Sequence, residues 1–156
     1  MCSGRPLAAV VLLSFMLLAE ATAASLEWRR YAIVATGLSV DVPVSIFEED
    51  RGATEGRGRH FFTKDYRANL TIKSFPNPQN DSPAVFLEKM RAPAEIQYKR
   101  MTPKFFAVSG ARDGFTWYNR CNRANGFMNC VLLNYPAAEE RQWDAVVRRI
   151  SLSLGK

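Results

Sequence analysis

The sequence predicts an α+β fold in which an antiparallel sheet is sandwiched by helices, with a C-terminal amphipathic helix packed on the sheet. Three observations lead to this prediction. Short runs that alternate apolar and polar residues are separated by turn residues, as in antiparallel strands. Cys121 and Cys130 flank an Asn-Gly pair symmetrically, which favours a hairpin. Near the C-terminus, apolar residues recur with the spacing of one helix face.

Residues 1–24 have the features of a secretory signal peptide. Arg5 supplies a positive charge and precedes the apolar run LAAVVLLSFMLL, and small residues at Ala21 and Ala23 form a cleavage site. The uncharged stretch is shorter than the ~20 residues of a spanning helix, so we expect cleavage, with an uncleaved anchor as the alternative. We expect residues 25–156 to form a single α+β domain in a periplasmic or secreted protein.

The first half of the mature chain predicts two hairpins. Alternating residues predict their strands at 28–34, 38–42, 60–63 and 69–75. Between the hairpins, the polar stretch EEDRGATEGRGR at 48–59 predicts a flexible loop, with a mobile binding loop as the alternative.

Two helices and two further strands follow. Ser82 as N-cap and Pro83 at the first helical position predict a helix over 83–91. Strands are expected at 95–101 and 104–109, before a turn at 110–114. The last helix has one apolar stripe and ends at Gly155; the stripe contains Trp143, Val146, Val147, Ile150 and Leu154.

The stretch 115–135 predicts the central hairpin, because it is apolar on both faces. A type I′ turn at Asn125 and Gly126 would place Cys121 opposite Cys130. Such a non-hydrogen-bonded pair has Cα atoms about 4.5 Å apart, near enough for a disulfide. An exported protein also meets oxidising conditions. Two reduced, buried cysteines are the alternative.

The chain is basic, with 21 Lys and Arg against 15 Asp and Glu and a formal net charge of +6. This charge favours anionic partners, and the absence of a recognition-helix or zinc motif argues against nucleic acid. We expect an anion-binding edge with Trp117 or Tyr118 as its aromatic floor, and the arginines expected there are Arg57, Arg59, Arg112 and Arg123. Scattered solubilising charge is the alternative.

No motif in the sequence predicts catalysis. It contains no nucleophile elbow, phosphate loop, dinucleotide fingerprint, EF-hand loop or HExxH, so we expect no catalytic residue, cofactor or metal. One alternative is a small hydrolase that uses His60, the single histidine, or a carboxylate pair. Another is an apolar-ligand carrier whose cavity is lined by Phe105, Phe106 and Trp117.

Four sequence stretches occur together in order: VDVPVSIF, HFF…NLTI, KFFAVSG, and VLLNYP before a Trp-containing amphipathic helix. In these the chain resembles small exported bacterial proteins of unknown function with a fold similar to PsbP, the extrinsic subunit of photosystem II. The resemblance implies a non-catalytic binding or assembly role, and no functional residue carries over. We expect a monomer that contacts an unknown protein or an anionic envelope polymer, with peripheral membrane contact as a further option.

Overall fold

The computed structural model describes residues 25–52 and 57–155, so the predicted signal peptide at 1–24 lies outside the described residues. Along the chain, the strands and helices are β1 (Trp28–Ile33), β2 (Leu38–Pro43), β3 (Glu49–Asp50), β4 (Gly58–Phe62), β5 (Asn69–Pro76), α1 (Pro83–Met90), β6 (Tyr98–Met101), β7 (Phe105–Arg112), β8 (Phe115–Ala124), β9 (Phe127–Pro136) and α2 (Glu140–Ser153). Within these ranges, no helix is long and apolar enough to cross a membrane.

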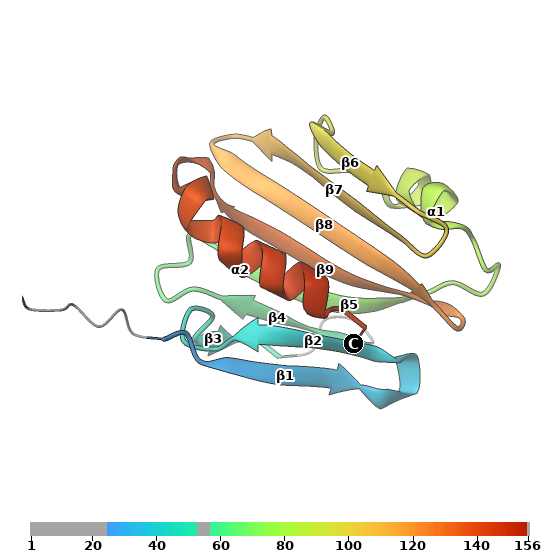
Figure 1. Cartoon of the computed structure of the whole chain (residues 1–156), viewed down its shortest axis with the longest axis horizontal. Coiled ribbons are helices and arrows are strands. Elements are labelled where there is room, and N and C mark those ends of the chain that lie inside the picture. Colours follow the sequence, from blue (N-terminus) through green and yellow to red (C-terminus); the bar gives the residue numbers. More distant parts are fainter. Residues whose placement is uncertain (1–24, 53–56, 156) are drawn as a thin grey trace, which may run out of the picture.

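Seven strands form one antiparallel sheet in the order β3-β4-β5-β9-β8-β7-β6. β1 and β2 form a separate hairpin, which lies beside α2 over the same face of the large sheet (Figure 1). α1 packs against β7 and β8 from the opposite face. The predicted α+β fold, with a sheet between helices and the C-terminal helix packed on it, is therefore confirmed.

The core under α2 explains why the last helix has a single apolar stripe. Ile150 from α2 is fully buried together with Val40 of β2, Leu70 and Ile72 of β5, and Val131 of β9. Burying an aliphatic side chain contributes about 1.5–3 kcal/mol, so the stripe, rather than helix propensity, holds α2 on the sheet.

The opposite face has its own smaller core, in which α1 and the disulfide meet. Leu87 of α1 packs with Phe106, Trp117 and the Cys121–Cys130 pair, all of which are buried. The two cores explain the apolar residues on both faces of β8 and β9, which lie in the middle of the sheet as predicted.

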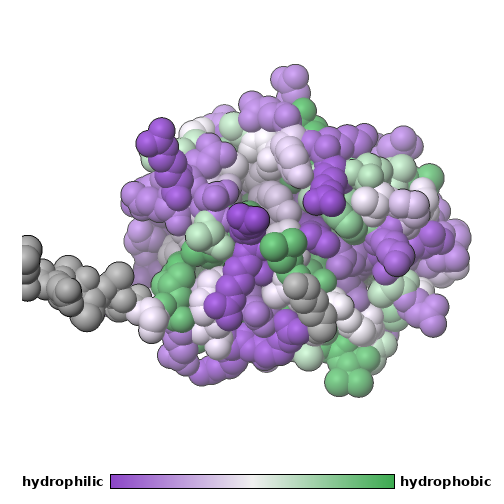
Figure 2. Space-filling view, viewed as in Figure 1, coloured by the Kyte–Doolittle hydropathy of each residue, from purple (hydrophilic) through white to green (hydrophobic). Residues whose placement is uncertain are grey.

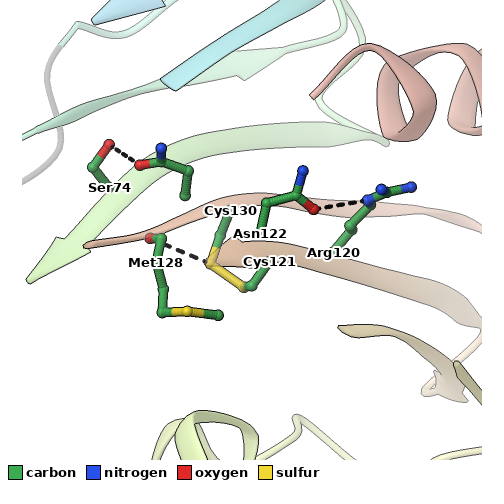
Figure 3. Close-up of a disulfide and its surroundings, with 7 residues drawn as sticks. Ser74, Arg120, Cys121, Asn122, Met128 and Cys130 are labelled. Carbon is green, nitrogen blue, oxygen red and sulfur yellow. Dashed lines mark hydrogen bonds between the residues drawn. A yellow bond between two sulfur atoms is a disulfide. The ribbon is translucent and has the colours of Figure 1, made fainter. Parts of the chain in front are cut away.

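The register of the β8–β9 hairpin is the predicted one, with Cys121 opposite Cys130. The two form a disulfide with a Cα–Cα distance of 4.1 Å (Figure 3). The predicted turn type is wrong. A type I′ turn requires positive φ at both Asn125 and Gly126. Gly126 has a φ of 72°, but Asn125 does not have a positive φ. The described non-glycine residues that do are Tyr66, Asn80, Arg91 and Asp113. A two-residue loop needs only Gly126 in the left-handed region when its turn is type II, so the register is unchanged.

Both φ angles of a type I′ turn occur instead at Asp113 and Gly114, with values of 52° and 80°. These two residues join β7 to β8, because Arg112 pairs with Phe115. The expected turn at 110–114 is therefore shorter than predicted, and Gly110 is a strand residue. A β-carbon on Gly110 would lie 2.3 Å from the backbone oxygen of Glu95 and 2.8 Å from the indole of Trp117, so glycine permits this packing.

Two other boundaries differ from the prediction. The expected loop at 48–59 contains β3, because Glu49 and Asp50 pair with Phe62 and Phe61, and β4 begins at Gly58. The strand expected at 95–101 begins at Tyr98. Tyr98 is the paired partner of Ser109, and the preceding residue Gln97 also donates its N–H to the Ser109 oxygen at 2.9 Å. Two residues of this strand therefore lie opposite one residue of β7. This extra residue is a β-bulge, which ends regular pairing.

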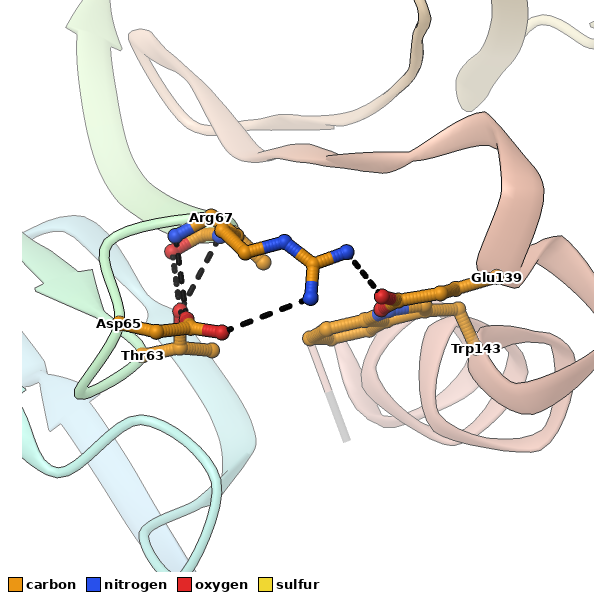
Figure 4. Close-up of polar contacts among 6 residues, drawn as sticks. Thr63, Asp65, Arg67, Glu139 and Trp143 are labelled. Atoms are coloured by element: carbon orange, nitrogen blue, oxygen red, sulfur yellow. Dashed lines mark hydrogen bonds and ion pairs between the residues drawn. The ribbon is translucent and has the colours of Figure 1, made fainter.

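A polar cluster fixes the start of α2 to the β4–β5 turn (Figure 4). The Arg67 guanidinium forms ion pairs with Glu139 and with Asp65. The indole N–H of Trp143 donates to Glu139 at 3.3 Å, and its ring stacks on Tyr135 with centroids 5.3 Å apart. α2 is thereby held at its N-terminus as well as along its apolar face.

Candidate anion-binding groove

A groove of about 430 Å³ separates the C-terminal half of α2 from strands β6, β7 and β8. The sheet side of the groove contributes Tyr98, Arg100, Phe105 and Arg120, and α2 contributes Arg148 and Ser151 among others. Figure 2 views the face that carries α2 and shows a surface rich in hydrophilic side chains with separate small hydrophobic patches. The groove combines arginine and aromatic side chains in one recess.

Strand register brings two of these arginines together. Arg100 of β6 pairs with Ala107 of β7, and Ala107 pairs in turn with Arg120 of β8. Directly paired residues project to the same face of a sheet, so both arginines face α2. The small side chain of Ala107 between them leaves room for both guanidinium groups.

Phe105 and Ser151 position the Arg120 guanidinium. Its centre lies 4.2 Å from the ring centroid of Phe105, and Arg100 lies 5.5 Å from the same ring. Arg120 Nη1 donates to Ser151 Oγ at 3.3 Å, and Nε donates to Asn122 Oδ1 at 3.0 Å. Stacking on an aromatic ring leaves further N–H groups of a guanidinium available, which suits binding of an oxyanion.

The groove has an excess of positive charge. The ion pairs of the described residues use other arginines, namely Arg29, Arg30, Arg51, Arg59, Arg67, Arg112 and Arg149. The groove is lined by three arginines, Arg100, Arg120 and Arg148, and by one acidic residue, Asp144. None of these three arginines forms an ion pair in the described part of the chain. Burial, and secondarily the charge of Arg100, lowers the pKa of Arg120, whereas Tyr118 acts to raise it.

Tyr118 closes the floor of the groove. Its hydroxyl lies 2.6 Å from Ser151 Oγ, and burial raises the pKa of this phenol. Tyr118 therefore stays neutral at physiological pH and contributes a hydrogen-bonding group, while the charge comes from the arginines. Asn122 Nδ2 also donates to the Leu154 oxygen at 3.0 Å, which fixes the end of α2 relative to β8.

The structure distributes the four arginines of the predicted anion-binding edge over three places. Arg57 stacks on Phe127, and Arg123 bonds to Asn80, so both lie near the β8–β9 turn. Arg59 pairs with Asp50. Arg112 pairs with Asp113 at the opposite end of β8 from Arg123. Anion binding by these four residues stays a prediction. The arginines that the structure brings together in the groove are Arg100, Arg120 and Arg148.

The structure also places the residues named for the two alternative functions. His60 lies on β4 with its ring packed against Phe62 at 4.4 Å. Phe106 and Trp117 are buried in the core under α1, whereas Phe105 lines the groove on the other face. The three aromatic residues proposed to line a carrier cavity therefore do not share one.

The comparisons with known proteins define the fold class. No protein-family model matches the chain, and no curated protein matches it in sequence. The structure resembles solved structures of PsbP-like architecture, so the PsbP-like fold predicted from the four sequence stretches is confirmed.

Two solved structures illustrate the similarity. Cyanobacterial PsbP (CyanoP) from Synechocystis sp. PCC 6803 has a TM-score of 0.59 at 11% identity, over 85% of this chain and 94% of that chain. The Ran-binding protein Mog1p of Saccharomyces cerevisiae has a TM-score of 0.54 at 8% identity, over 83% of this chain and 95% of that chain. At these identities the likeness defines the fold, and function must be argued from the site.

Proposed function

We propose that the protein is an exported, monomeric, non-catalytic binding module that recognises an acidic segment of another protein through the groove. One observation carries this proposal: Arg100, Arg120 and Arg148 line one recess, and none of them forms an ion pair within the described ranges. Uncompensated positive charge beside aromatic rings is suited to carboxylate recognition.

The export part of the proposal rests on residues 1–24 and on the disulfide. A disulfide between Cys121 and Cys130 persists in an oxidising compartment. A role in protein binding agrees with one structural neighbour, since Mog1p is a Ran-binding protein.

The shape of the groove favours a protein segment over a membrane surface. Arg120 is partly buried between α2 and the sheet, with its side chain stacked on Phe105. A flat lipid surface contacts charges that project outward, whereas a recessed guanidinium is reached by a narrow chain that enters the groove. Exposed Tyr98 and Leu152 at the rim add apolar area that a protein segment can cover.

Fluorescence anisotropy with a labelled glutamate-rich peptide tests this function. We expect binding that weakens as salt rises, because the Debye length falls from about 10 Å at 0.1 M to about 3 Å at 1 M. The pair Arg100→Glu and Arg148→Glu should abolish binding. The pair Arg57→Glu and Arg123→Glu, with the same change in charge, is the matched control and should bind nearly as well as the wild type.

Two results would contradict the proposal. Equal losses for both double variants would mean that net charge alone attracts the peptide. Sedimentation of the wild type with anionic phospholipid vesicles, with no binding of the peptide, would instead identify a lipid surface as the partner.

A further inference from the structure

β6 is the last strand of the large sheet (Figure 1), and its residues Tyr98 and Arg100 line the groove. It contains Tyr98, Lys99, Arg100 and Met101, of which the first three are exposed. An edge strand with free backbone groups is a template for pairing with another chain.

The hydrogen-bond pattern shows which backbone groups are free. Thr102 N–H donates to the Phe105 oxygen at 2.9 Å, which marks a hydrogen-bonded pair beside the β6–β7 turn. Bonded and non-bonded pairs alternate along an antiparallel ladder, so Arg100 and Tyr98 bond to β7. Lys99 and Met101 therefore direct their N–H and C=O groups outward, where no described residue bonds to them.

We propose that the acidic segment binds as an additional antiparallel or parallel strand on the outer edge of β6. This inference rests on the proposed function and specifies its binding mode. A strand added at β6 would bond to the backbone of Lys99 and Met101. Every second side chain would face α2 and extend the row formed by Arg100, Ala107 and Arg120.

The positive charge of β6 favours an acidic segment over a second copy of the chain as the strand that pairs with it. Lys99 and Arg100 are both exposed on β6, and Arg120 and Arg148 lie in the adjoining groove. Pairing of β6 with β6 of a second copy would set these like charges against each other, which is destabilising. An extended segment with carboxylates at alternate positions instead places its acids over the groove.

Two labelled peptides of identical composition test this mode. One alternates glutamate with threonine, and the other has its glutamates consecutive. Addition as a strand predicts tighter binding of the alternating peptide, because its carboxylates then share one face. Equal affinities would contradict strand addition.

A matched pair of variants tests the backbone contact. Lys99→Pro removes the outward N–H together with the charge, whereas Lys99→Thr removes the charge alone. Proline is tolerated on an edge strand where its N–H faces solvent, and circular dichroism and the Tm of both variants check the fold. We expect Lys99→Pro to bind the alternating peptide about fivefold more weakly than Lys99→Thr, the effect of one lost hydrogen bond.

The outcomes separate the two proposals. Strand addition is wrong if the two Lys99 variants bind equally and both peptides bind alike, while the pair Arg100→Glu and Arg148→Glu still abolishes binding. The groove then remains the binding site. If neither peptide binds the wild type in a salt-dependent way, both proposals are overturned.

Discussion

The Arg120 guanidinium lies 4.2 Å from the ring centroid of Phe105, with Arg100 stacked on the same ring at 5.5 Å. Two cations on one aromatic ring repel each other, and the charge of Arg100 lowers the pKa of Arg120 in addition to the effect of burial. An anion bound between these two guanidinium groups would neutralise that repulsion. The position of the two guanidinium groups on one ring is therefore suited to an anion.

Arg120→Met should separate binding from stability. Methionine keeps the length and packing of the side chain and removes a partly buried charge, so we expect the free energy of unfolding to stay constant or rise by about 1 kcal/mol. Binding of the glutamate-rich peptide should weaken. Urea unfolding and anisotropy measure the two effects, with Arg141→Met on the exposed part of α2 as control. A large loss of stability would assign Arg120 a structural role.

Removing the disulfide should destabilise the fold modestly. Cys121 and Cys130 are separated by 9 residues, and closing a loop of this size contributes about 2–3 kcal/mol. Replacing both cysteines with alanine should lower the urea midpoint. Reductant should bring the wild type toward the same midpoint and leave the variant unchanged. No response of the wild type to reductant would contradict a disulfide in the native protein.

Gly110→Ala tests the close packing between β7 and the segment before β6. The new methyl group would meet the Glu95 oxygen and the Trp117 indole, so we expect a loss of about 1–3 kcal/mol from overpacking. Urea unfolding measures the loss, and near-ultraviolet circular dichroism reports the environment of Trp117. Ala111→Ser, at the exposed next residue, should leave both signals unchanged.

Stability should fall at high pH because of Tyr135. Burial raises the pKa of this phenol to about 12, above the pKa of about 10 that a free tyrosine has. The folded state thus holds its proton where the unfolded chain releases it, so this stabilisation is complete below pH 10 and is lost as pH rises toward 12. Urea midpoints measured between pH 9 and 11 should decline less in Tyr135→Phe, which keeps the stacking on Trp143. Identical declines would exclude Tyr135 as a cause.

Local chemistry made much of the fold predictable. Register in the β8–β9 hairpin follows from counting outward from Asn125 and Gly126, and the structure confirms the opposed cysteines. The spacing of Trp143 and Ile150 likewise identified the buried face of α2. These features depend on neighbours in sequence, so periodicity and turn chemistry suffice.

The groove depends on three strands and a helix that come together only in the folded chain. One strand pair of the groove could have been predicted from the sequence. Asp113 and Gly114 are typical of a type I′ turn, and counting outward from them places Arg120 opposite Ala107. Placing Arg100 in the same row also requires the turn before Phe105. The position of α2 over that row depends on packing, which no local pattern specifies.

Two-dimensional ¹H–¹⁵N NMR of the protein with the glutamate-rich peptide would show whether the peptide occupies the groove. We expect the peptide to shift the amide signals of Tyr98–Met101, of Arg120 and of the α2 turn that contains Arg148 and Ser151. Shifts centred instead on Arg57 and Arg123 near the β8–β9 turn, or no salt-sensitive shifts at all, would contradict binding in the groove.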